Sequence, residues 1–271
     1  MSKQHTVIMT FPSWKWNEYG QYCLPTADKN WPDNFKVIAI VEKPGDIPYK
    51  VSDRVEIIDF DIAVGARQSA FEERNKHRNI MDMGTTGNIA VQAAKFSRKA
   101  LAQLYILENT NKGYVWYIDA DTKVLQKLTP EFLDGLTSSD AYIGCTPRWW
   151  RRDISNEQAL KTKQLGLGYT ETGVMFWNTE HSMHTEWCKL YASMYDEDKI
   201  FEYDIWHDCI AFDHATLTLL TQKKIGMADL GFGVRSSHPL VAGPLGKYFD
   251  HMKGQRKFVG FSKERVKVHG K

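Results

Sequence analysis

Two aspartates separated by one residue stand at the end of an apolar run near the middle of the chain. The run YVWYI, residues 114–118, predicts a buried strand, and Asp119 and Asp121 follow it directly. A single Asp at a strand end is commonly structural, because its short side chain bonds backbone N–H groups in turns. Two carboxylates this close repel each other unless a cation lies between them. The pair therefore indicates a Mn²⁺ or Mg²⁺ site that handles a phosphorylated ligand.

The composition is that of an ordinary globular protein of 271 residues, enough for one large α/β domain or two small ones. Apolar residues make up 42% of the chain, yet no run of 18 predicts a membrane span. The N-terminus has no apolar stretch long enough for a secretory signal. The four cysteines are far apart and form no CxxC pair, which argues against a zinc cluster or a disulfide scaffold. We expect a cytoplasmic protein with no membrane contact and no obligate protein partner.

Apolar runs and periodic segments predict strands that alternate with helices. Strands are expected at 6–11, 35–41, 55–60, 114–118, 142–145 and 173–177, and helices within 13–31, at 87–107 and at 206–220. This alternation predicts an α/β, Rossmann-like fold with a mostly parallel sheet flanked by helices. In such sheets ligands bind outside the carboxyl ends of the strands, where the two aspartates are expected.

The chain reads as one catalytic domain over residues 1–246, followed by an irregular basic C-terminal segment over residues 247–271. The whole chain has a net charge of only +2. The C-terminal segment holds eight Lys or Arg and two acids, so it carries +6. Concentrated positive charge is commonly a solvated surface, and it can also bind phosphate or nucleic acid.

Three further stretches carry groups that suit a metal-bound diphosphate. HMKGQRK, residues 251–257, spaces a histidine, a glycine and a lysine as H-x-x-G-x-x-K. Neutral imidazole can complete a carboxylate metal site, glycine lets the backbone approach phosphate, and lysine adds a point charge. YTETGVMFWN, residues 169–178, and WHDCIAF, residues 206–212, add the acids Glu171 and Asp208.

In order and spacing, these stretches and the D-x-D pair resemble the GT-A fold nucleotide-sugar glycosyltransferases. The resemblance is to their glycogenin-like and bacterial lipopolysaccharide galactosyl- and glucosyltransferase branch. It implies transfer of a sugar from a nucleotide-diphosphate sugar, in the first place a UDP-sugar, with retention of anomeric configuration. It also implies that Asp119, Asp121 and His251 hold the metal, and that Gly254 and Lys257, with Asp119, hold the diphosphate.

The residues expected around the sugar depart from the family pattern. Glu171 stands where the family has Asn, and Trp206 and His207 replace its Asp-Gln. We expect Glu171, Asp208 and His207 to be catalytic, with Glu171 as a nucleophile, an electrostatic stabiliser or a base. Inversion of configuration therefore stays open beside retention.

Other donor contacts are expected on two elements. The end of the first strand is expected to line the nucleoside pocket, and a basic pair on the helix before the D-x-D strand matches a donor-binding position of the family. These residues are Thr10, Phe11, Arg98 and Lys99. A solvated helix face is the alternative for the basic pair, and His238 is the alternative to His251 as third metal ligand.

The acceptor is a hydroxyl whose carrier stays open. TPRWWRR, residues 146–152, sets arginines around two tryptophans, a combination that can stack bases and hold phosphates. The alternative is a core tryptophan pair beside a solvated basic turn. The N-terminal pattern of strand, aromatic-rich helix and WP is similar to small glycosyltransferases of tailed phages, some of which decorate hydroxymethylated pyrimidines in DNA. We therefore expect either such DNA or a surface glycan or protein hydroxyl, with acceptor contacts from Trp149, Trp150, Arg151 and Arg152.

Two other classes of protein fit parts of the pattern. Haloacid dehalogenase-type phosphatases use D-x-D-x-T after a strand with the first Asp as nucleophile, but Lys123 stands at the Thr position here. A non-catalytic module that binds nucleotide sugars or nucleic acid would show binding without turnover. The three ordered candidate metal ligands favour the enzyme.

Overall fold

The computed structural model describes residues 3–78, 80, 92–137, 141–149, 155, 157–158, 170–234, 236 and 238–270. Nine strands lie in this described part of the chain, at β1 (His5–Pro12), β2 (Lys36–Glu42), β3 (Val55–Asp59), β4 (Tyr114–Ile118), β5 (Thr122–Val124), β6 (Ala141–Thr146), β7 (Glu171–Asn178), β8 (Gly226–Asp229) and β9 (Phe249–His251). The α-helices are α1 (Gly20–Asn30), α2 (Ala66–Asn75), α3 (Ala93–Glu108), α4 (Pro130–Leu136), α6 (His184–Asp196), α7 (Asp208–Thr221), α8 (Pro239–Ala242), α9 (Arg256–Val259) and α10 (Lys263–His269).

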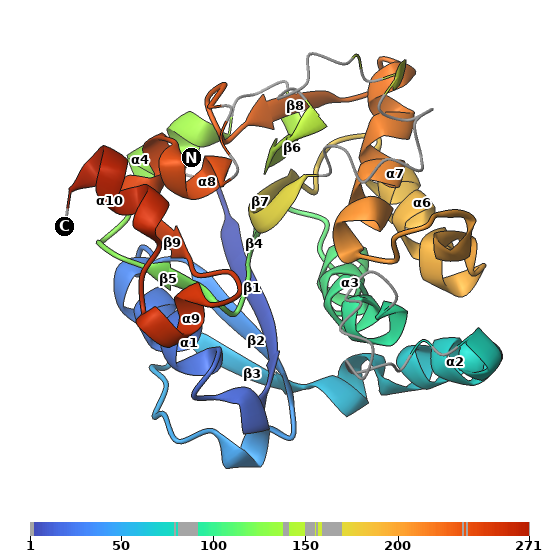
Figure 1. Ribbon diagram of the computed structural model, residues 1–271, viewed down its shortest axis with the longest axis horizontal. Coiled ribbons are helices and arrows are strands. Elements are labelled where there is room, and N and C mark those ends of the chain that lie inside the picture. Colours follow the sequence, from blue (N-terminus) through green and yellow to red (C-terminus); the bar gives the residue numbers. More distant parts are fainter. Residues whose placement is uncertain are drawn as a thin grey trace.

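Seven strands form one sheet in the order β3-β2-β1-β4-β7-β6-β8 (Figure 1). The pairs β3–β2, β2–β1, β1–β4 and β6–β8 are parallel, whereas β7 runs antiparallel to both β4 and β6. Each strand predicted from an apolar run is present to within two residues. The α/β fold with a mostly parallel sheet flanked by helices, which the resemblance to GT-A enzymes implies, is confirmed.

Side chains alternate between the two faces of the sheet and build two apolar cores. On β1, Ile8 packs into the core that includes residues of α2, α3, α6 and α7, whereas Val7 and Met9 pack into the core that includes residues of α1, α4 and α8. Figure 1 shows these two groups of helices on opposite sides of the sheet. Burial on both faces explains why the strands read as continuous apolar runs rather than as alternating patterns.

The basic segment after residue 247 returns to the middle of the chain. Its strand β9 pairs antiparallel with β5, so that His251 lies opposite Thr122. Phe249, His251 and Met252 are buried in the domain. The expected irregular extension thus consists of β9 and two short helices, α9 and α10, and its first residues cover the region just after β4 (Figure 1).

Several elements differ from the sequence expectations. Of the helix expected at 87–107, α3 begins at Ala93, and residues 87–91 lie outside the described residues. Strand β8 is not predicted from an apolar run because its four residues, GMAD, are all only half-buried.

All four cysteines are buried and unpaired, which agrees with the absence of a disulfide scaffold. In the described part of the chain, no helix is both long and apolar enough to cross a bilayer.

Candidate functional site

The backbone turns sharply after β4 and brings the two aspartates to one side. The N–H of Asp119 donates to the carbonyl of Gly173 on β7 (2.9 Å), and its own carbonyl accepts from the N–H of Thr122 (2.8 Å). The carbonyl of Asp121 accepts from the N–H of Met252, just after β9 (2.9 Å). These bonds fix both residues at the carboxyl end of β4, where the sequence predicts them.

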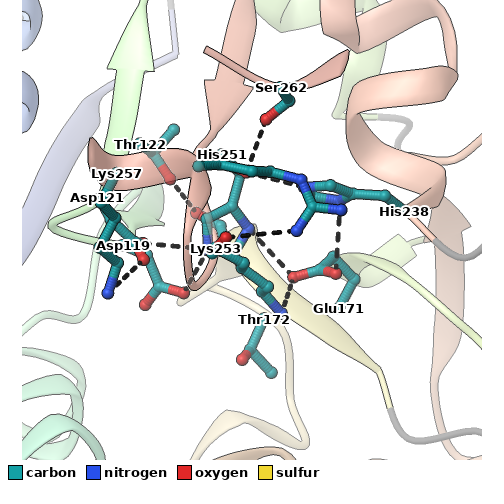
Figure 2. A network of polar contacts seen from close by, with 12 residues as sticks. Asp119, Asp121, Thr122, Glu171, Thr172, His238, His251, Lys253, Lys257 and Ser262 are labelled. Carbon is teal, nitrogen blue, oxygen red and sulfur yellow. Dashed lines mark hydrogen bonds and ion pairs between the residues drawn. The ribbon is translucent and has the colours of Figure 1, made fainter. Parts of the chain in front are cut away.

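His251 faces both aspartates with one ring nitrogen. Its Nε2 lies 3.2 Å from Asp119 Oδ2 and 3.0 Å from Asp121 Oδ1 (Figure 2). The alternative, His238, lies behind it: His238 Nε2 donates to the backbone carbonyl of His251 at 2.7 Å. The geometry therefore brings His251, and not His238, to the aspartate pair.

Each aspartate holds a lysine with its second oxygen. Lys99 Nζ on α3 lies 2.6 Å from Asp119 Oδ1, and Lys257 Nζ on α9 lies 3.1 Å from Asp121 Oδ2. Lys99 also lies 2.8 Å from Asp208 Oδ2, at the start of α7. The two lysines thus each contact one oxygen of an aspartate, and the other oxygen of that aspartate faces His251.

A third carboxylate lies on the other side of the imidazole. Glu171, the first residue of β7, is fully buried, and its Oε1 is 3.1 Å from Nδ1 of His251. The same oxygen is 2.5 Å from Lys253 Nζ, and Oε2 is 2.8 Å from Arg148 Nη2. Glu171 is therefore enclosed by an imidazole and two cations (Figure 2 draws the imidazole and Lys253).

Gly173 makes room for the imidazole. A Cβ atom at this position would lie 2.1 Å from His251 Nδ1 and 2.4 Å from Cε1, closer than any real contact. The glycine of the T-G-V stretch is thus required for the position of His251 rather than for a special backbone angle.

The charges in this cluster stabilise one another. Burial by itself would raise the pKa of Asp121, but His251 and Lys257 outweigh it and hold that pKa far below its usual range. Burial likewise opposes ionisation of Asp119, and Lys99 and His251 lower its pKa. The pKa of His251 is raised to about 10, because the attraction of Asp121 and Glu171 exceeds the cost of burial. The carboxylates are therefore ionised and available as ligands at neutral pH.

The donor set fits a divalent cation. Single ligand atoms of Asp119, Asp121 and His251 all lie within 4.8 Å of one another. Adjacent ligands of an octahedral ion with bonds of about 2.1 Å are about 3.0 Å apart, which matches the 3.0 and 3.2 Å separations to Nε2. Two carboxylate oxygens and one imidazole suit Mn²⁺ or Mg²⁺. Three protein ligands leave further positions for the oxygens of a phosphorylated ligand.

The other predicted donor-site residues are distributed unevenly. Lys99 belongs to the cluster, whereas its neighbour Arg98 pairs with Glu42 (2.8 Å) and Glu72 (3.3 Å). The strands β1 and β4 are parallel, and Ile8 pairs with Tyr117. Thr10 and Asp119 each follow this pair by two residues, so both lie at the same end of the sheet. Phe11 is buried, with its ring 6.1 Å from that of Trp16.

Gly254 adopts a left-handed backbone, with φ of +58°, in the turn between β9 and α9. This conformation favours glycine and directs the chain back towards Lys257. A Cβ at this position would meet no atom within 4 Å, so the close packing seen at Gly173 does not occur here.

Of the remaining predicted catalytic and acceptor residues, Asp208 contacts the cluster through Lys99. Asp208 is nearly buried and accepts from the hydroxyl of Thr172 at 2.9 Å, while the ring of His207 packs 4.4 Å from that of Phe96. Trp149 is only 1% exposed. The predicted acceptor residues Trp150, Arg151 and Arg152 lie outside the described residues.

Two residues of the cluster were not assigned to it from sequence. Lys253 stands between the matched His and Gly of the H-x-x-G-x-x-K stretch, and Arg148 is one of the arginines around the two tryptophans of TPRWWRR. Both contact Glu171. A Glu that begins a largely apolar, buried strand indicates that buried cations must exist elsewhere in the chain, but it does not identify them.

Comparison with known proteins adds a likeness of fold. No protein-family model matches the chain, and no curated protein does so. Solved structures do match; one of them is the apo structure of WbbM, a bifunctional glycosyltransferase, with 12% sequence identity and a TM-score of 0.48. The match covers 85% of this chain and 40% of that chain, so this chain spans less than half the length of that protein. A likeness of this strength says nothing of activity, which has to be inferred from the site.

Proposed function

We propose that the protein is a metal-dependent glycosyltransferase that moves a sugar from a nucleotide-diphosphate sugar, first of all a UDP-sugar, to a hydroxyl acceptor. The observation that carries the proposal is the convergence of Asp119, Asp121 and His251 at the carboxyl end of β4, with Lys257 in contact with Asp121. The D-x-D and H-x-x-G-x-x-K stretches, which resemble one glycosyltransferase branch, are thereby parts of a single site.

The roles follow from charge and position. Asp119, Asp121 and His251 would hold Mn²⁺ or Mg²⁺, which when bound neutralises charge that builds on a departing diphosphate. Lys257, already beside Asp121, would turn to a phosphate oxygen. In the transfer, the bond between the anomeric carbon and the diphosphate breaks and the electron pair stays on the diphosphate. The acceptor oxygen forms the new bond to that carbon and its proton is lost to a base or to water.

The alternative classes are less well supported by these contacts. A phosphatase of the haloacid dehalogenase type would need Asp119 to attack phosphorus. Both oxygens of Asp119 are engaged, one by Lys99 and the other by His251. This arrangement favours a ligand role over a nucleophilic one.

The test is donor hydrolysis and transfer with a panel of nucleotide sugars, with Mn²⁺ and with excess EDTA. We expect release of nucleoside diphosphate from one donor with Mn²⁺, and none with EDTA. Donor binding without any release would favour a binding module, and full activity in EDTA would remove the metal from the proposal.

Two finer features of the reaction extend the proposal. Following the resemblance, we propose retention of anomeric configuration, which NMR of the product's anomeric proton measures. For the acceptor we propose DNA with hydroxymethylated pyrimidines, supported by the basic C-terminal segment and the phage-like N-terminal pattern. The measurement is transfer of labelled sugar to duplex DNA containing 5-hydroxymethylcytosine or 5-hydroxymethyluracil. No incorporation and no salt-sensitive DNA binding would favour a glycan or protein hydroxyl.

A further inference from the structure

The two nitrogens of the His251 imidazole face carboxylates on opposite sides. Nε2 is turned to Asp119 and Asp121, and Nδ1 is turned to Glu171 at 3.1 Å (Figure 2). Within the described part of the chain, the buried Nδ1 has no aligned hydrogen bond, and the atom that faces it is Oε1 of Glu171. A buried N–H left without an acceptor costs about 1–3 kcal/mol, so an orientation that aligns Nδ1 with this oxygen is favoured.

The surroundings of Glu171 do not suit attack on a sugar. Its side chain is fully buried, and Lys253 Nζ and Arg148 Nη2 hold its two oxygens at 2.5 and 2.8 Å. A carboxylate stabilised in this way is a poor nucleophile and a poor base, because both roles require it to leave its cations.

We propose that Glu171 is a positioning residue for the metal ligand His251. It would accept the Nδ1–H of the imidazole, so that when a metal ion replaces the proton on Nε2, the Nε2 lone pair points at the aspartate pair. Metal-ligating histidines generally donate their other N–H to a carboxylate or a carbonyl, which sets the ring orientation and makes the ligand more basic. This role rests on the proposed metal site and replaces the nucleophile or base expected for Glu171 from sequence.

The rest of the histidine's surroundings supports the same role. The backbone carbonyl of His251 accepts from His238 Nε2 (2.7 Å) and from the Ser262 hydroxyl (3.3 Å), which hold the residue through its backbone. Gly173, two residues after Glu171, leaves the space in which the ring lies. One strand, β7, thus supplies both the acceptor for Nδ1 and the gap for the ring. Arg148 and Lys253 then balance the charge of Glu171 so that the carboxylate can remain buried.

The decisive experiment compares Glu171→Gln with Asp28→Asn. Asp28 is also a shielded carboxylate, and its partners Tyr49, Ser52 and Arg54 lie outside the candidate site. Mn²⁺ affinity is measured without donor, from the electron paramagnetic resonance signal of free Mn²⁺. We expect Glu171→Gln to weaken Mn²⁺ binding about 10–100-fold, as loss of such a partner usually does. Asp28→Asn should leave the affinity unchanged.

Turnover separates the two roles of Glu171. If Glu171 positions His251, turnover of Glu171→Gln should return towards the wild-type value as Mn²⁺ is raised to saturation. Wild-type Mn²⁺ affinity together with lost turnover would overturn the proposal and restore a direct role in chemistry. Absence of Mn²⁺ binding by the wild-type protein would overturn the proposed metal site itself, which is a different result.

A measurement on the wild-type protein covers the case in which Glu171→Gln does not fold. The ¹⁵N chemical shifts of the His251 ring, recorded with diamagnetic Mg²⁺, report which nitrogen carries the proton. We expect the proton on Nδ1. A proton on Nε2 with Mg²⁺ present would overturn the proposal, because that nitrogen would then be no ligand and Nδ1 no donor to Glu171.

Discussion

Carboxylates face both nitrogens of the His251 imidazole, but their exposure to solvent differs. On the Nε2 side, the side chains of Asp119 and Asp121 are 17% and 12% exposed to solvent, and each is in contact with one lysine. On the Nδ1 side, the side chain of Glu171 is not exposed to solvent and is enclosed by Arg148 and Lys253.

This difference separates ligand binding from ligand positioning. A carboxylate that retains some access can exchange a lysine for a metal ion or a phosphate group. A sealed carboxylate cannot make that exchange, since removing its cations would leave a buried, unpaired charge. The accessible side is therefore the one on which chemistry is expected, and the sealed side holds the ring in place.

The largest expected effect is on the accessible side. Asp121→Asn removes a charged ligand oxygen, and we expect turnover to fall by at least about a thousandfold, as when a catalytic metal is lost. Steady-state donor hydrolysis measures the change. Asp33→Asn, at an exposed aspartate paired with Lys127, is the control and should be unaffected. An Asp121→Asn enzyme with near wild-type turnover would mean that the accessible pair binds no catalytic metal.

The histidines on either side of Glu171 should differ in metal binding. His251→Ala removes the Nε2 ligand, and we expect Mn²⁺ affinity to fall about a hundredfold. His238→Ala removes a donor to the His251 carbonyl and a side chain whose Nδ1 lies 3.9 Å from Glu171 Oε2, but no atom that faces the aspartate pair, and should change the affinity by less than about tenfold. Calorimetric titration with Mn²⁺ checks both. The reverse order of effects would identify His238 as the ligand.

Adding one methyl group at Gly173 tests whether the space beside the His251 ring is required. Gly173→Ala would place Cβ against Nδ1 and Cε1 of His251, so the ring must move. We expect a loss of about 1–3 kcal/mol in the free energy of unfolding, together with weaker Mn²⁺ binding. Denaturant unfolding measures the first effect.

Gly135→Ala is the matched control for this substitution. Gly135 lies in α4, and an added Cβ would meet no atom within 4 Å. We expect this change to be neutral or stabilising by up to about 1 kcal/mol, because alanine favours the helix. Equal effects of the two substitutions would show that the contact with the ring is unimportant.

Another buried carboxyl, that of Asp213, shows the effect of burial where cations do not offset it. Asp213 on α7 is bonded to the N–H (2.9 Å) and hydroxyl (2.5 Å) of Thr170. Burial, which no adjacent cation offsets fully, raises its pKa to about 8. The folded state therefore binds a proton that the unfolded state releases near pH 4, so this group makes stability fall as pH rises from about 4 to about 8.

Asp213→Asn should remove this pH dependence. The slope it removes is at most about 1.4 kcal/mol per pH unit. Unfolding free energies at pH 5, 6, 7 and 8 in both proteins measure the slope. An unchanged profile would mean that Asp213 is ionised in the folded state, as Glu171 is.

The architecture was predictable from local pattern, and so was the gathering of Asp119, Asp121, His251 and Lys257 in one candidate site. Six strands are predictable from apolar runs because burial on both faces leaves few polar residues within most of them. The pairing of D-x-D with H-x-x-G-x-x-K came from ordered motifs and a resemblance. By contrast, α2, α4 and α6 were not predicted from sequence, and β8 was missed because its residues are only half-buried.

What the sequence by itself determined is the chemistry available: two close carboxylates after a strand, a histidine and lysine in a later basic segment, and a glutamate where the glycosyltransferase family that the sequence resembles has Asn. Only the tertiary structure decided their roles. Arg98 and Lys99 are adjacent on one helix, yet only Lys99 reaches Asp119. Glu171 is sealed because Arg148, just after β6, and the pair His251 and Lys253, at the end of β9, meet it from distant parts of the chain. Burial and pKa depend on groups that are distant along the chain, so no local pattern of residues could assign them.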